Sequence, residues 1–291
     1  MPVHEGDTMS LDKVPYFIID MKTAVERVAG KEPTEIAPGC CDQNGNWYFY
    51  IGLPGRNTKP LSYNVAPTGK IQFPEEIVKL YQESLDLNME AVKAQASEDR
   101  SAGFAISAYP ALRAKQLAIR KYALHHSTLI RRVLSGSFEA RQRSAAAQFL
   151  GYAAQSRTQI QSLVQASHDP IEAVRNNAVR ALGVLAESSP SIARQIPAGK
   201  IIPMLNSDVW TDRNKGSFLL GALTLSRDRK VLALIRAQAA DSLIEMARWH
   251  EYGHAYYSRI ILGRIAGIEE NKLQKLAHDG VESIISTFSS H

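Results

Sequence analysis

The residues with the most recognisable chemistry are two histidines with a glutamate beside the first of them, His250, Glu251 and His254. Two histidines four residues apart on one helix can hold a zinc ion, and the glutamate can then act as a general base on a zinc-bound water. The segment 250–254 reads His-Glu-Tyr-Gly-His and fits this spacing. It therefore indicates zinc hydrolysis as one function to be tested.

A catalytic zinc site also needs a third protein ligand, and the downstream sequence supplies none at a recognised spacing. Tyr257 and Ile260 stand where the metzincin pattern has Gly and His, and Gln274 stands near the place of the thermolysin-like Glu; Glu269 and Glu270 lie closer. We therefore interpret the match as accidental. We expect no bound metal, no other cofactor and no enzymatic activity.

Positive charge is concentrated in residues 113–143. This segment carries eight Arg and Lys residues against one acid, Glu139, whereas the whole chain has a formal net charge of only +5. Such a segment can form a solvated helix surface or a patch that binds phosphate or other acidic groups. Nucleic-acid binding through 113–143 is therefore kept as an alternative function.

Three arginines occupy a fixed place before a Leu-Gly pair. Arg143, Arg175 and Arg213 each lie eight residues before the glycine of such a pair. Because Arg suits multidentate bonds, one interpretation is structural, with each guanidinium bound to an acid or to turn carbonyls. The other is a row of cations that meets a ligand. The binding residues predicted on this second interpretation are Arg143, Arg175, Arg213, Asn177 and, as an aromatic anchor, Trp210.

The elements that carry these residues follow a helical repeat. Leu-Gly pairs end at Gly151, Gly183, Gly221 and Gly263, at spacings of 32, 38 and 42 residues. A small residue stands five positions before each glycine, which lets neighbouring helices approach closely. Repeats of this length stack helix pairs, so that each pair covers the apolar face of the next.

The segment from Asp169 to Gly183 resembles the second helix of a HEAT repeat, which often reads D-P-x-x-x-V-R-x-x-A-x-x-A-L-G. The resemblance covers about residues 98–287, with one regular copy and three degenerate ones, and Ala255 takes the arginine place in the last. It implies a mainly α fold, an armadillo-like α-α superhelix, that acts as a non-catalytic scaffold for a protein or peptide. Its register also places Trp249 in a turn and His250 at a helix start, against the zinc interpretation.

Residues 1–73 predict a small α+β module. We expect a helix over 20–28, an aromatic strand over 47–51 and a second strand over 61–66. The order resembles the small α-β-β modules of the PepSY type, through Asn44-Gly45 before Trp47-Tyr48 and through Thr68-Gly69-Lys70-Ile71. This resemblance implies an extracytoplasmic setting.

The remaining boundaries follow from apolar periodicity and turn residues. We expect a connecting helix over 74–97 and helical repeats over 98–291, with helices at 110–126, 127–135, 139–154, 157–167, 171–187, 191–196, 208–225, 230–248, 251–266 and 270–287. No apolar run is long enough to cross a membrane. We expect a cytoplasmic protein with two idle thiols, Cys40 and Cys41, or an extracytoplasmic one if a signal peptide has been removed.

Overall fold

The computed structural model describes residues 14–39, 47–54 and 61–290, and in them the predicted mainly α fold is confirmed. Thirteen α-helices account for most of these residues, and the four strands are short. In this part of the chain, no helix combines the length and the apolar character that a membrane crossing requires. The predicted thiols Cys40 and Cys41, and the turn at Asn44 and Gly45, lie outside the described residues.

The chain divides into two compact units, each assembled from separate stretches of sequence. The first unit comprises Met1–Pro60, Met204–Asn214 and Ala239–His291, and the second comprises Leu61–Pro203 and Lys215–Gln238. Helices α9 (Trp210–Leu223) and α10 (Arg229–Ala247) therefore contribute to both units. Helix α10 departs from helical geometry at Ala239, the residue at which it enters the first unit.

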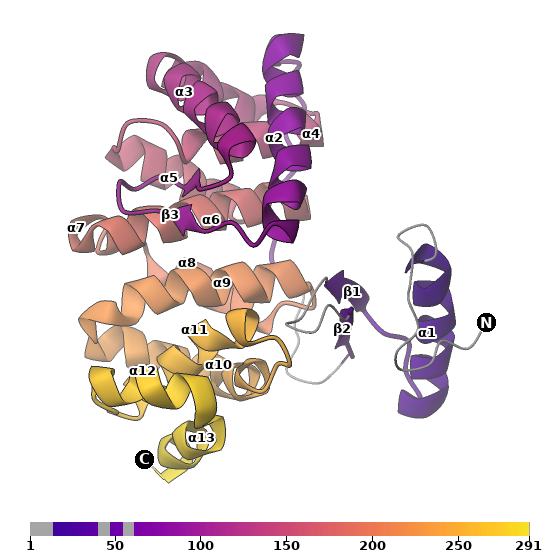
Figure 1. Ribbon diagram of the computed structural model, residues 1–291, viewed down its shortest axis with the longest axis vertical. Coiled ribbons are helices and arrows are strands. Elements are labelled where there is room, and N and C mark those ends of the chain that lie inside the picture. The colour runs from indigo at the N-terminus through magenta and orange to yellow at the C-terminus, as the bar shows by residue number, and fades with distance from the viewer. Residues whose placement is uncertain (1–13, 40–46, 55–60, 291) are drawn as a thin grey trace. The chain divides into compact units, whose positions relative to one another are not determined.

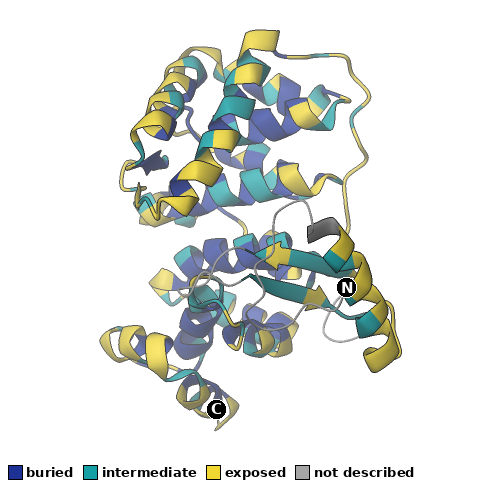
Figure 2. Ribbon diagram, turned by 45° about the vertical axis from the view of Figure 1, so that its right-hand side comes forward, coloured by how far each residue is buried: buried dark blue, intermediate teal, exposed yellow. Residues whose placement is uncertain are grey.

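The second unit is a set of packed helices with one very short β-ladder. Its complete elements are α2 (Glu75–Lys93), β3 (Glu98–Asp99), β4 (Ile106–Ser107), α3 (Pro110–Gly136), α4 (Ala140–Leu150), α5 (Arg157–Ala166), α6 (Glu172–Ser188), α7 (Pro190–Ala193) and α8 (Ala198–Ile201). Helix α3 packs against α2 and α4, and α6 packs against α4 and α5 (Figure 1). Buried residues concentrate on the facing sides of these helices (Figure 2).

Local signals set the ends of several of these helices. Pro110 occupies the first turn of α3, where its missing N–H costs no hydrogen bond. Ser156 and Gln159 form a capping box at the start of α5, in which each side chain bonds the backbone N–H of the other. The predicted helices 110–126 and 127–135 form one helix, but His126 has non-helical dihedral angles at the predicted break.

The strand predicted over 61–66 does not form, and the prediction is wrong. The segment before α2 is extended, but its partners are turns between helices. The Asn64 N–H donates to the carbonyl of His168 at 2.7 Å, and the Phe138 N–H donates to the carbonyl of Gly69 at 2.7 Å. A side chain at Gly69 would place its Cβ 2.5 Å from the Gly136 carbonyl oxygen, so only glycine allows this close approach.

The first unit combines a two-stranded β-ribbon with helices from the end of the chain. Its elements are α1 (Val14–Ala29), β1 (Glu35–Gly39), β2 (Tyr48–Gly52), α11 (Tyr252–Ile265), α12 (Glu270–Asp279) and α13 (Val281–Ser290). Strand β1 runs antiparallel to β2, with Ala37 opposite Tyr50. The sequence predicts the aromatic strand β2 but not β1, because Pro38 and Gly39 are typical of turns. Each strand of a two-stranded ribbon is an edge strand, where proline is tolerated.

Candidate functional site

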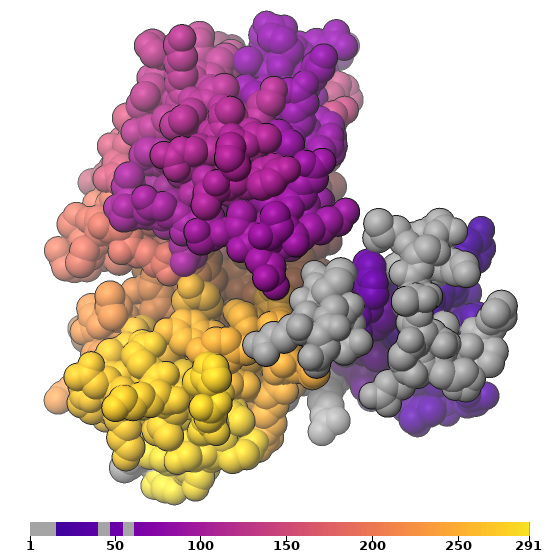
Figure 3. Space-filling model, viewed as in Figure 1, coloured from indigo at the N-terminus to yellow at the C-terminus, as the bar shows by residue number. Residues whose placement is uncertain are grey.

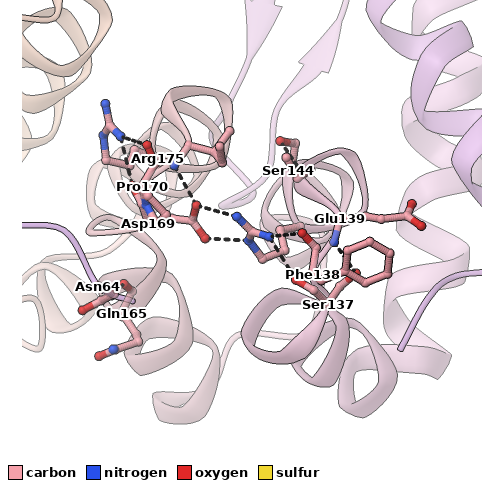
Figure 4. A network of polar contacts seen from close by, with 12 residues as sticks. Asn64, Ser137, Phe138, Glu139, Ser144, Gln165, Asp169, Pro170 and Arg175 are labelled. Carbon is pink, nitrogen blue, oxygen red and sulfur yellow. Dashed lines mark hydrogen bonds and ion pairs between the residues drawn. The ribbon is translucent and has the colours of Figure 1, made fainter. Parts of the chain in front are cut away.

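The arginine that begins the repeated pattern is a buried structural residue. Arg143 retains 1% of its surface, and its Nε and Nη2 donate to the two carboxylate oxygens of Asp169 at 2.8 and 3.0 Å (Figure 4). Its Nη1 donates to the carbonyl oxygens of Ser137 and Phe138 at 2.9 and 3.1 Å. The guanidinium therefore joins the turn before its own helix to the turn before α6.

Arg175, which lies 32 residues after Arg143, makes the same bonds to the turn before its own helix. Its Nη1 donates to the carbonyl oxygens of Asp169 and Pro170 at 2.9 and 3.1 Å, again six and five residues before the arginine. The side chain retains 1% of its surface, and the guanidinium lies 4.6 Å from the centre of the Tyr63 ring. Each of these two arginines thus bonds the turn before its own helix in the same way.

The turn itself recurs with equivalent residues. The side chain of Ser137 accepts a hydrogen bond from the Glu139 N–H at 3.3 Å, and Asp169 accepts one from the Ile171 N–H at 2.8 Å. In the first unit, the Ser207 hydroxyl accepts one from the Val209 N–H at 3.1 Å. The three turn residues stand six positions before the three arginines. The recurrence in sequence is therefore matched by a recurrence in local geometry.

The third arginine, Arg213, lies in the first unit and is 6% exposed. Its Nη1 donates to Glu245 at 2.9 Å, and the guanidinium lies 5.5 Å from the centre of the Trp249 ring. All three predicted arginines are therefore buried, and a binding role for them stays a prediction. The structure supports the structural interpretation of their spacing.

Arg259 on α11 is a further buried arginine that binds backbone carbonyls, and the sequence pattern does not predict it. Its Nε donates to the Ala247 carbonyl at 2.8 Å, and its Nη1 donates to the Ala277 carbonyl at 2.8 Å. Burial lowers the pKa of this guanidinium. In the repeat register, Ala255 stands in the place of the arginine. Arg259 lies four residues later, which is about one helical turn.

Trp210, the predicted aromatic anchor, lies in a cluster of rings in the first unit. Its ring stacks on that of Tyr50, with centroids 4.9 Å apart, and meets the His254 ring edge-on at 5.0 Å. Tyr50 also contacts Trp249, at 4.7 Å between centroids. The backbone N–H of Trp210 donates to the side chain of Glu35, which ties the start of α9 to strand β1. Contacts at these distances are typical of stabilising aromatic pairs.

A cavity of about 300 Å³ opens beside this cluster, and we refer to it as the aromatic groove. The groove is lined by Glu35, Tyr48, Phe49, Tyr50, Ile51, Gly52, Ser207, Asp208, Trp210, Arg213, Glu245, Arg248, Trp249 and His250. Trp210 and Trp249 are partly exposed, and Arg248 keeps half of its side-chain surface while pairing with Glu282 at 2.7 Å. The groove therefore offers aromatic faces and charged groups together.

Three polar atoms in or beside the aromatic groove are buried. Within the described residues, the Tyr50 hydroxyl, the Trp210 indole N–H and the Arg213 Nε make no hydrogen bond of ordinary geometry. Burial raises the pKa of the Tyr50 phenol, the neighbouring Tyr48 adds to the rise, and the Trp210 side chain opposes part of it. Tyr50 is therefore neutral at physiological pH, and the cluster carries unused hydrogen-bonding capacity.

The two histidines of the zinc-like segment do not share a helix. Helix α11 begins at Tyr252 with Glu251 as its N-cap, so His250 precedes the helix and His254 lies within it. Both ring nitrogens of His254 already have neighbours, with Nε2 3.3 Å from the Tyr48 hydroxyl and Nδ1 3.2 Å from the Asn214 amide oxygen. The described part of the chain contains no group of three or more His, Cys, Asp or Glu residues placed to hold a metal ion.

We expect purified protein to contain far less than one zinc ion per chain, even after incubation with zinc and removal of the excess. The reason is that His250 and His254 lack the helical spacing and the third ligand that tight binding requires. Elemental analysis of the wild type and of a His254→Ala variant measures this. One zinc per chain in the wild type, lost in the variant, would instead support the hydrolase alternative.

Five of the eight cations in the basic segment 113–143 have hydrogen-bond or ion-pair partners within the second unit, and Arg131 is one of them, donating to the Thr128 hydroxyl at 3.1 Å. Lys115 pairs with Glu83 at 2.6 Å, and Arg120 donates to the Ala153 carbonyl at 2.9 Å. Arg141 donates to Gln82 at 3.1 Å, and Arg143 is buried. Exposed cations remain on α3, whose side chains form part of the surface in Figure 3, at Arg113, Lys121 and Arg132. Nucleic-acid binding through this segment remains an untested alternative.

Asn177, the last predicted binding residue, also has internal partners. Its Nδ2 donates to the Tyr81 hydroxyl at 3.3 Å and to the Ser144 carbonyl at 3.0 Å. It therefore joins α6 to α2 and α4. Compared with protein-family models and with curated proteins, the chain shows no match.

Proposed function

We propose that this protein is a non-catalytic scaffold of HEAT-like helical repeats, an armadillo-like α-solenoid, that binds a segment of another protein. The proposal of a repeat is supported by the matched bonds of Arg143 and Arg175, each to carbonyls six and five residues earlier. It is supported further by the equivalent turn residues Ser137, Asp169 and Ser207. Helical repeats typically expose an extended face on which partners bind.

We infer that the binding site is the aromatic groove, and its composition carries this proposal. Trp, Tyr and Arg are the residue types most often found at the energetic centres of protein interfaces. The groove combines Tyr48, Tyr50, Trp210 and Trp249 with the half-exposed guanidinium of Arg248.

The chemistry of the groove favours a partner segment with a basic residue beside an apolar or aromatic one. Three acids line the groove, Glu35, Asp208 and Glu245, against two bases, Arg213 and Arg248. Each base already pairs with a carboxylate, Arg213 with Glu245 and Arg248 with Glu282. Aromatic faces also attract cations. Lys or Arg in the partner would therefore meet both rings and carboxylates.

Selection from a displayed library of random peptides tests this function on the full chain. We expect enriched peptides to pair Lys or Arg with a large apolar residue. We expect Trp249→Ala to weaken binding of a synthetic copy at least about tenfold, because it truncates a central aromatic contact. Fluorescence anisotropy of labelled peptide measures the affinity.

Phe138→Ala is the matched control, because Phe138 is an aromatic residue of the second unit that is 51% exposed and lies outside the groove. It should leave the affinity unchanged. The proposal fails if no peptide is enriched, or if enriched peptides bind the Trp249→Ala and wild-type proteins equally well.

A further inference from the structure

The second unit contains a cavity of about 240 Å³ that is separate from the aromatic groove. It lies among α2, α3, α4 and α6 and the residue Lys215 of α9. The cavity is lined by Ser84, Leu85, Asn88, Phe104, Ala105, Leu112, Gln116, Gln148, Gly151, Tyr152, Asn176, Asn177, Arg180, Ala181, Val184 and Lys215. Its volume lies below the range of about 300–1,000 Å³ that is typical of drug-sized ligand sites, so its occupant would be small.

The Lys215 ammonium is the charged group of this cavity that lacks a direct partner. Among the described residues, no carboxylate, carbonyl or hydroxyl forms a hydrogen bond or ion pair with it. Its side chain lines the cavity, and the residue is only partly exposed. Burial, followed by the nearby Arg180, lowers the pKa of Lys215 to about 8. An ammonium in such surroundings gains most from a neighbouring anion.

The charges around Lys215 leave a positive excess. Arg180 pairs with Glu98, and Arg100 pairs with Glu187 at 3.3 Å and with Glu98 at 4.0 Å. Both carboxylates therefore pair with arginines, and neither of them pairs with Lys215. A bound anion would offset the positive charge that remains.

The other titratable groups near the cavity do not cancel the positive charge around Lys215. Burial raises the pKa of the Tyr152 phenol to about 12, so this lining residue is neutral at physiological pH. Arg120 lies 4.3 Å from the centre of the Phe104 ring, and its Nη1 donates to the Ala153 carbonyl at 2.9 Å. It adds positive potential to the same side of the cavity wall that carries Phe104.

The rest of the lining is amphipathic. Apolar side chains of Leu85, Phe104, Leu112 and Val184 form much of the wall, beside the side-chain amides of Asn88, Asn176, Asn177, Gln116 and Gln148. Several amides are held in place, since Gln148 donates to the Ser84 hydroxyl at 3.1 Å and Gln116 accepts from the Ser107 N–H at 2.7 Å. Apolar walls with a few fixed polar groups are typical of small-molecule sites.

We propose that this cavity binds a small monocarboxylate, whose carboxylate pairs with the Lys215 ammonium and whose apolar part lies against Phe104, Leu112 and Val184. The amides provide further donors for the carboxylate oxygens. Such a site goes beyond the scaffold function and does not depend on it, because the aromatic groove shares no residue with this cavity.

Titration of the full chain with benzoate tests the site, with amide NMR shifts of Gly151 and Ala181 as the readout. We expect saturable binding at concentrations up to about 20 mM, and at least about tenfold weaker binding to Lys215→Met, because the variant loses a charge-assisted hydrogen bond. Lys200→Met is the matched control, since Lys200 is an exposed lysine of the same unit that lies outside the cavity. It should bind as the wild type does.

Two comparisons on the wild type keep the test decisive even if Lys215→Met fails to fold. Benzamide, the neutral isostere, should bind at least about tenfold more weakly than benzoate. Because the carboxylate pairs with the protonated amine, affinity should be constant below pH 7 and fall as the pH rises through the Lys215 pKa of about 8.

Three results would overturn the proposal. Absence of saturable benzoate binding removes the site. Equal affinity for benzamide, or equal affinity of the Lys215→Met protein, removes the role of the ammonium. Tighter binding of inorganic phosphate than of benzoate would show an anion site of another class, without the apolar contribution of the cavity wall.

Discussion

Replacing Asp169 by alanine is expected to lower the free energy of unfolding by about 3–5 kcal/mol, because it leaves the buried guanidinium of Arg143 without its counter-charge. Both oxygens of Asp169 accept from Arg143, and one also accepts from the Ile171 N–H. Arg143 is 1% exposed and Asp169 is 6% exposed, so water cannot replace the lost carboxylate without a rearrangement. Chemical denaturation of both proteins, followed by circular dichroism, measures the difference.

Two further variants separate the ion pair from the turn. Asp169→Asn keeps an acceptor for the Ile171 N–H but removes the charge, so it should lose most of the same stability. The double variant Arg143→Met with Asp169→Ala should lose less than the sum of the two single losses, because it leaves no unpaired charge. Additive losses, or a loss below about 1 kcal/mol for Asp169→Ala, would contradict a structural role for the pair.

Replacing Phe149 by alanine is expected to cost about 3–5 kcal/mol of unfolding free energy, because it opens a cavity in the centre of the second unit. Phe149 on α4 is fully buried, and its ring lies 5.9 Å from that of Phe73, 6.1 Å from that of Tyr122 and 6.4 Å from that of Tyr81. These rings come from the segment before α2, from α3 and from α2, so the substitution weakens several helix contacts together.

The same measurement on Phe138→Ala provides the control for Phe149→Ala. Phe138 is 51% exposed, and the bonds it makes to Gly69 and Arg143 use only its backbone. We expect a change within about 0.5 kcal/mol for this variant. Equal losses for the two phenylalanines would contradict the assignment of Phe149 to the core.

The sequence predicts most helices because their signals are local. Apolar spacing and turn residues mark α2, α5 and α6 within a few residues of their observed ends. The strand predicted at 61–66 fails for the opposite reason. Its residues suit an extended chain, but the partners of that chain are the turns at Phe138 and His168, which no local pattern reveals. One helix predicted over 270–287 is two helices, because the chain breaks at Gly280.

The candidate sites are harder to predict from local sequence patterns than the helices are. Trp210 is singled out by its type, but the ring partners Tyr50 and Trp249 come from distant parts of the sequence and meet it only in the folded unit. The spacing of Arg143, Arg175 and Arg213 predicts a shared role, and burial favours the structural interpretation. Lys215 has no sequence signal at all, since its importance depends on a cavity built by other helices.

The location of a bound peptide tests the proposed scaffold function most directly. A peptide enriched by display and carrying a photoreactive benzoylphenylalanine is crosslinked to the full chain, and mass spectrometry identifies the modified residues. Binding in the aromatic groove predicts crosslinks to 48–52, 207–213 and 245–250, which the Trp249→Ala substitution reduces. Crosslinks confined to the basic segment 113–143, or unaffected by Trp249→Ala, would contradict it.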